Sequence, residues 1–127
     1  MTNKFIASDV IHASIVHKIS DLFKMLYQNT KGLPKVDKYG IRSKTESVIL
    51  ACLRLAIKAA LMQKLEKLPV VKELKIEIET LKQFIRLELE LSTLKEKNYG
   101  VFQEKLQEIS KMTSGWIEYL QQKELNQ

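Results

Sequence analysis

Residues 48–62 read VILACLRLAIKAALM, and only Arg54 and Lys58 interrupt this apolar run. The run spans several helical turns and contains neither glycine nor proline, so it predicts a helix that is apolar on almost every side. In a lone four-helix bundle, each helix offers only one stripe to the core. We therefore predict that this helix belongs to a bundle and that its remaining apolar surface is covered by self-association.

Outward from this run, three more segments carry the helical period, and the chain has only 4 Gly and 2 Pro to break them. The connections between the last three segments are short, and short connections join antiparallel neighbours. We predict one all-α domain over residues 1–127, an antiparallel up-down-up-down four-helix bundle. The predicted helices cover about 9–28, 44–64, 69–92 and 96–123. Their core stripes outside the first run are Ile11, Ile15, Ile19, Leu22 and Leu26, then Val71, Leu74, Ile78, Leu81, Ile85 and Leu89, then Tyr99, Phe102, Leu106, Ile109, Thr113, Trp116, Ile117 and Leu120.

Local signals mark the predicted helix ends. Ser8 or Asp9 can cap the first helix, and Gly32 with Pro34 ends it in a lysine-rich loop of roughly ten residues. Ser43 and Glu46 have the spacing of a capping box for the second helix. Pro69 suits the first turn of the third helix. Gly100 and Gly115 lie inside the fourth helix, where we expect them to mark close approach by a neighbouring element.

The residues that carry most enzyme chemistry are scarce or badly spaced. The single cysteine, Cys52, lies in the apolar run, which favours a buried small hydrophobe over a nucleophile. The only histidines, His12 and His17, are five residues apart and point in different directions on a helix, so we predict no metal site. Carboxylates such as Glu77 and Glu79 are two apart and do not face each other. We predict a protein that is not an enzyme and has no cofactor.

The N-terminal residues lack an apolar core of signal-peptide length, and no apolar run is long enough to span a membrane. A single cysteine also fits a reducing compartment. These features favour a cytoplasmic protein with no membrane partner.

The net charge of +6 is concentrated in residues 31–67, which hold nine basic residues against three acidic ones, while the rest of the chain is balanced. A basic loop that also contains Tyr39 is typical of phosphate contact combined with base stacking, although a solvated lysine loop has the same pattern. The third helix adds a basic stripe of its own. Our candidate nucleic-acid or partner-binding residues are Lys35, Lys38, Arg42, Lys44, Arg54, Lys58, Lys75, Lys82 and Arg86.

The third helix also carries Ile76, Leu87 and Leu91 on a flank that its own core stripe does not use. Together with the apolar run at 48–62, this surplus apolar surface predicts a homo-oligomer.

Four pieces of the sequence resemble the Avd family, the accessory variability determinants of diversity-generating retroelements, and their kin, the four-helix-bundle proteins encoded in 23S rRNA intervening sequences. The pieces are Leu33-Pro-Lys35, Tyr39-Gly-Ile-Arg42, Phe84-Ile-Arg86-Leu and Glu108-Ile-Ser-Lys-Met-Thr-Ser-Gly-Trp-Ile117. The resemblance extends from about residue 10 to residue 121. It departs from the family at Thr113-Ser114, where Leu-Gly often precedes Gly-Trp.

The resemblance implies a five-membered ring of four-helix bundles with a positive surface. It implies binding to the reverse transcriptase and to template RNA, both of which mutagenic cDNA synthesis requires. Arg42, Arg86 and Lys82 match basic positions of the family pattern, and Gly115 with Trp116 matches its structural ending. An alternative is a protein of the intervening-sequence type with a structural or protein-interaction role.

Overall fold

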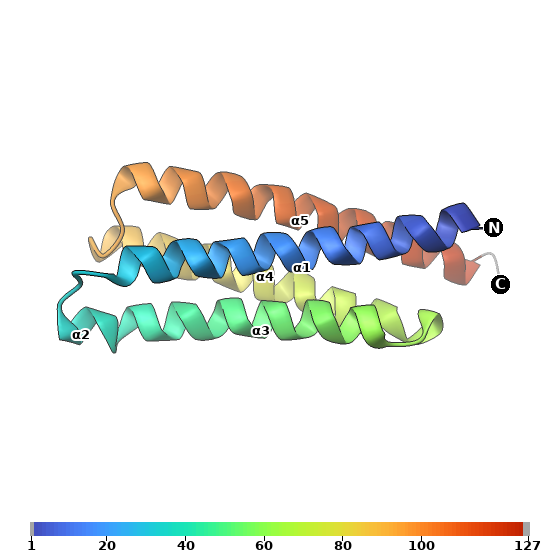
Figure 1. The fold of residues 1–127 in the computed structure, drawn as a ribbon, viewed down its shortest axis with the longest axis horizontal. Helices are drawn as coiled ribbons and strands as arrows, with labels where there is room; N and C mark the ends of the chain where they lie inside the picture. Colours follow the sequence, from blue (N-terminus) through green and yellow to red (C-terminus); the bar gives the residue numbers. More distant parts are fainter. Residues whose placement is uncertain (1, 126–127) are drawn as a thin grey trace.

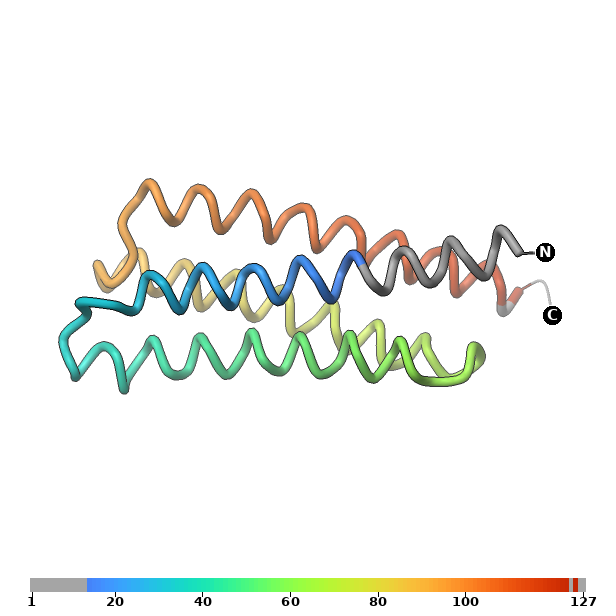
Figure 2. Tube along the Cα trace, viewed as in Figure 1, coloured from blue at the N-terminus to red at the C-terminus, as the bar shows by residue number. Residues whose placement is uncertain are grey.

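The computed structural model describes the backbone of residues 2–125 and the side chains of residues 14–123 and 125. Within these residues all regular structure is helical, as predicted (Figures 1 and 2). The elements are α1 (Thr2–Thr30), α2 (Lys35–Lys38), α3 (Ile41–Leu61), the 3-10 turn η1 (Lys64–Glu66), α4 (Lys67–Glu90) and α5 (Glu96–Leu125).

The four long helices run antiparallel in chain order, which confirms the predicted bundle (Figure 1). Each long helix packs mainly against two neighbours, in the pairs α1–α3, α3–α4, α4–α5 and α1–α5. One end of the bundle holds residues 31–40 and the α4–α5 turn at residues 91–95, and the α3–α4 connection lies at the other end. We call the first of these the loop end.

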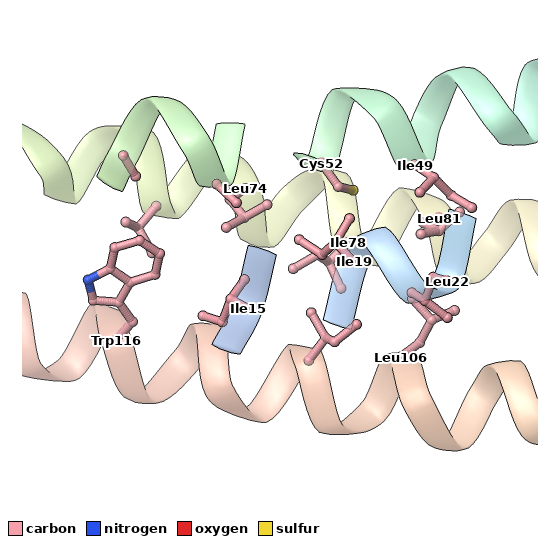
Figure 3. Packing of buried hydrophobic residues seen from close by; sticks show 14 of the residues in the cluster. Ile15, Ile19, Leu22, Ile49, Cys52, Leu74, Ile78, Leu81, Leu106 and Trp116 are labelled. Atoms are coloured by element: carbon pink, nitrogen blue, oxygen red, sulfur yellow. The ribbon is translucent and has the colours of Figure 1, made fainter. Parts of the chain in front are cut away.

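The core is formed where the apolar stripes of all four long helices meet (Figure 3). Ile19, Cys52, Ile78 and Leu106 show the pattern, since each comes from a different helix and each is almost fully buried. Burying an aliphatic side chain of this size contributes about 1.5–3 kcal/mol. The described members of the predicted stripes are buried or partly buried. Ile11 lies outside the described side chains.

The helix ends differ from the predictions. α1 begins at Thr2, well before the expected start, and the predicted caps Ser8 and Asp9 lie outside the described side chains. α3 begins at Ile41, so the predicted capping box at Ser43 is wrong. Gly40 stands at the helix start instead.

The short helix α2, predicted as a loop, comes directly before α3. In the turn between them, a Cβ atom at Gly40 would lie 2.5 Å from the carbonyl oxygen of Val36, four residues earlier in the chain. Gly32, in the preceding loop, has a φ of 87°. By contrast, no described residue comes within 4 Å of a Cβ atom placed at Gly100 or Gly115, so the prediction of close approach is wrong for the described part of the chain.

Candidate nucleic-acid interface

The outer face of α3 carries exposed cations. One side of α3 is buried in the core, and it carries Thr45, Ile49, Cys52 and Ala56. At about 100° per residue, Lys44, Arg54 and Lys58 fall on the opposite side. All three are exposed, and none has an ion-pair partner among the described residues. Their charges are therefore available to an external anion.

Helix α2 extends this positive surface to the loop end. Lys35 and Lys38 are exposed, and Tyr39 is 71% exposed. The Lys38 Nζ atom lies 5.7 Å from the centre of the Tyr39 ring. Pro34 stands at the start of α2, where its fixed φ suits the turn into a helix. We call Lys35, Lys38, Tyr39, Lys44, Arg54 and Lys58 together the α2–α3 basic surface.

Arg42 is not part of this surface, and its predicted role as a surface contact is wrong. Its side chain is 0% exposed. Its Nε donates to both carboxylate oxygens of Glu88 at 2.9 and 3.0 Å, and its terminal nitrogens donate to Thr30 Oγ1 and to the carbonyl oxygen of Thr93, each at 3.0 Å. Thr93 also donates its hydroxyl to Glu88 at 2.8 Å. Because α3 begins at Ile41, Arg42 falls on the buried side of the helix.

We call Arg42, Glu88, Thr30 and Thr93 the Arg42–Glu88 network, and the sequence analysis missed its other three members. One signal could have found Glu88. It follows Leu81 and Ile85 at helical spacing, so it lies on the core stripe of α4, where a carboxylate needs a buried cation.

Lys67 is also buried, although it belongs to the basic region 31–67. Its Nζ donates to the carbonyl oxygens of Ala59 and Ala60 at 2.7 and 3.3 Å. These carbonyls belong to the last turn of α3, where a cation is favourable.

Lys75 and Lys82 on α4 face α5 and share the carboxylate of Glu79. Lys82 lies 3.1 Å from Glu79 and donates to Gln107 at 3.2 Å. Lys75 lies 3.6 Å from Glu79 and donates to the hydroxyl and carbonyl oxygens of Ser110. Desolvation acts to raise the pKa of Glu79, but the hydrogen bonds from Lys82 and Ser110 and the charges of both lysines outweigh it and hold that pKa below its ordinary value. These lysines join α4 to α5, and part of their charge is neutralised.

Arg86 is exposed at a cleft of about 390 Å³ between α4 and α5. Its Nε lies 3.6 Å from Glu90, which is a weak pairing because both groups are solvated. Tyr99 and Gln103 form the α5 side of the cleft, and Gln103 donates to the Tyr99 hydroxyl at 3.0 Å.

The nine predicted residues thus divide into three groups. Five lie on the α2–α3 basic surface, three lie on α4 beside α5, and Arg42 is buried. The family model described as bAvd-like matches residues 13–120. The chain belongs to the bAvd-like family. A search of curated proteins and a search of solved structures each found no match.

Membership of the bAvd-like family confirms the resemblance seen in the sequence and identifies an accessory-protein family. In this chain Arg42 holds the loop end together, whereas Arg86 faces solvent.

Cys52 is placed as the sequence indicated, in the buried core. Desolvation raises the pKa of its thiol to about 12. His17 is exposed and lies 3.3 Å from Asp21, whereas His12 lies outside the described side chains. No group of three His, Cys, Asp or Glu residues that could hold a metal ion occurs among the described residues. Nor is any described helix long and apolar enough to cross a membrane.

Proposed function

We propose that this protein is a non-catalytic accessory protein of a diversity-generating retroelement. It binds template RNA and the reverse transcriptase, and in this way supports mutagenic cDNA synthesis. The observation that carries the proposal is the set of exposed, unpaired cations on the α2–α3 basic surface of a bAvd-like chain.

The α2–α3 basic surface suits RNA better than the α4 stripe does. Lysine and arginine side chains bind RNA by displacing counterions from its phosphates, and a cation already held by a carboxylate contributes less. Lys44, Arg54 and Lys58 have no such partner among the described residues, whereas Lys75 and Lys82 share Glu79. Tyr39 adds an exposed ring on which a base can stack.

Arg86 and the cleft between α4 and α5 offer a second, chemically different contact. The cleft combines Arg86 with Tyr99 and the apolar side chain of Leu87, a mixture typical of protein-binding surfaces. We therefore assign this cleft, together with Lys75 and Lys82 beside it, to the reverse transcriptase.

Self-association belongs to the same proposal. α3 exposes Leu50, Ile57 and Leu61, the last of them 82% exposed. α4 exposes Ile76, and Leu91 is exposed just past its end, and neither lines the cleft assigned to the reverse transcriptase. Two apolar surfaces on different helices support head-to-tail contacts between copies, and such contacts close into a ring when the rotation permits. The family resemblance supplies five as the number of copies.

RNA binding as a function of salt tests the proposal. We expect the affinity for single-stranded RNA, measured by fluorescence anisotropy, to fall steeply between about 50 and 200 mM salt as phosphate contacts are lost. A reverse transcriptase of a diversity-generating retroelement, co-expressed with the tagged protein, should co-purify with it. Absent RNA affinity, or affinity that does not change with salt, would overturn the RNA role.

A further inference from the structure

A second cleft lies at the loop end, outside every residue that the sequence singled out for binding. It has a volume of about 400 Å³ and lies between the residues that follow α1 and those that precede α5. In Figure 1 these two connections lie at the same end of the bundle. Lys31 lines one side of the cleft, and Lys95 lines the other.

The electrostatics of this loop-end cleft favour an anion. Lys31 and Lys95 are exposed, and neither has an ion-pair partner among the described residues. None of the described residues that line the cleft is acidic, and the amides of Gln28 and Asn98 add neutral donors. The cleft also lies at the first turn of α5, where the backbone N–H groups give a partial positive charge.

The walls of the cleft are held in place by bonds to the rest of the bundle. Asn98 donates to Asn29 Oδ1 at 2.9 Å, and Asn29 donates to the carbonyl oxygen of Met25 at 3.0 Å. Thr93, at the edge of the cleft, is fixed by the Arg42–Glu88 network. Asn98 is therefore positioned before a ligand arrives, which lowers the entropy lost when it binds one.

Ser92 adds a further observation. It lines the cleft with a φ of 62°, the only positive φ among the non-glycine residues described. Glycine adopts this conformation with less strain and is the usual residue at such a helix end. The serine instead keeps a hydroxyl beside the cleft.

We propose that the loop-end cleft binds a phosphodiester group of single-stranded RNA, with Lys31 and Lys95 neutralising its charge and Asn98 donating to a phosphate oxygen. The inference rests on the proposed function and adds a site to it. RNA is the source of the phosphate because Lys31 leads along the chain into Lys35 and Lys38, so a strand on the α2–α3 basic surface continues into the cleft. The volume suits one nucleotide rather than a small ion alone.

The first test compares two double variants that remove equal charge. Lys31→Ala with Lys95→Ala alters the cleft, whereas Lys64→Ala with Lys111→Ala removes exposed lysines elsewhere. Each phosphate contact with single-stranded RNA contributes about 0.7 to the slope of log affinity against log salt. We expect the cleft pair to lower that slope by about 1.4 for two contacts and the control pair to lower it much less.

A second measurement does not depend on lysine substitution. In ¹⁵N spectra of the whole protein, single-stranded RNA should shift the backbone amides of Gly32, Ser92 and Asn98, and Asn98→Ala should weaken RNA binding without a change of charge. Inorganic phosphate and a free mononucleotide are titrated separately. If these two shift the amides and RNA does not, the site binds free phosphates and the proposal is wrong.

The outcomes separate the two proposals. If wild-type protein binds RNA but the cleft pair behaves like the control pair, the cleft proposal is overturned and the proposed function stands. If wild-type protein binds no RNA, both are overturned.

Discussion

Arg42 and Glu88 form a buried ion pair between α3 and α4, and their remaining polar atoms bond to Thr30 and Thr93. Burying two charges has a large desolvation penalty, which only good geometry and further hydrogen bonds offset. Here both conditions are met. The pair fixes the positions of α1, α3 and the α4–α5 turn relative to one another, and so it supports both edges of the loop-end cleft.

Removing one partner should be far more damaging than removing both. We expect Arg42→Met or Glu88→Leu alone to lower the free energy of unfolding by about 3–5 kcal/mol, because a charge is left buried without its partner. The double variant should lose much less. Urea unfolding of the four proteins measures this, and losses that simply add would show that the two charges are not coupled.

Gly40 and Gly115 differ in the space that surrounds a Cβ atom added to each. Gly40→Ala should destabilise the protein by about 1–3 kcal/mol, since the new Cβ meets the Val36 carbonyl and one helix must move. Gly115→Ala is the matched control, because no described residue comes within 4 Å of its Cβ. It should stabilise the helix by up to about 1 kcal/mol. Thermal unfolding distinguishes them, and a neutral Gly40→Ala would contradict the close approach of the Val36 carbonyl.

At the scale of elements, Lys75, Lys82 and Glu79 hold α4 against α5. The pKa of Glu79 is lower in the folded protein than in the unfolded chain. Its contribution to stability is therefore complete above the unfolded value, about 4.3, and is lost as pH falls through the lower folded value.

Glu79→Gln removes this dependence. Wild-type protein should lose its advantage over Glu79→Gln as the pH is lowered from about 5 to 3, by no more than about 1 kcal/mol because the carboxylate is half exposed. Unfolding curves of both proteins at several pH values provide the comparison. An advantage that grows toward low pH would contradict the assigned contacts.

The helices themselves could be predicted because each one repeats its apolar residues at helical spacing. Ile15, Ile19 and Leu22, for instance, define the buried side of α1 without reference to any other segment. The start of α3 could not be predicted in this way. The local pattern favoured Ser43 as the cap, whereas the helix begins after Gly40, which has no side chain with which to cap it.

The candidate site was predictable only in part, for a related reason. Charge counting finds Lys44, Arg54 and Lys58, which remain free in the described structure, but it cannot distinguish them from Arg42 or Lys67. Arg42 is buried against Glu88, which lies far along the chain. Lys67 is buried against the last turn of the preceding helix, α3. The loop-end cleft could not be predicted from the sequence, because Lys31 and Lys95, which line it, are distant in the chain.

At the scale of the whole molecule, the exposed apolar residues of α3 and α4 predict self-association. Sedimentation equilibrium should give a mass several times that of the 14.7 kDa chain. Ile57→Glu and Ile76→Glu should each reduce this mass, since a charge is costly to bury in an interface. Val36→Glu, at an exposed position on α2, is the control. A monomeric wild-type protein would contradict the ring.

We propose that RNA binds on the α2–α3 basic surface, where Lys44, Arg54 and Lys58 have no ion-pair partner among the described residues. The most direct test compares Arg54→Gln/Lys58→Gln with Lys75→Gln/Lys82→Gln, which remove the same charge from different sides. At about 50 mM salt, we expect the first pair to lose roughly tenfold or more in affinity for single-stranded RNA and the second pair to lose little. Equal losses of affinity, or a larger loss for the α4 pair, would contradict RNA binding at the α2–α3 basic surface.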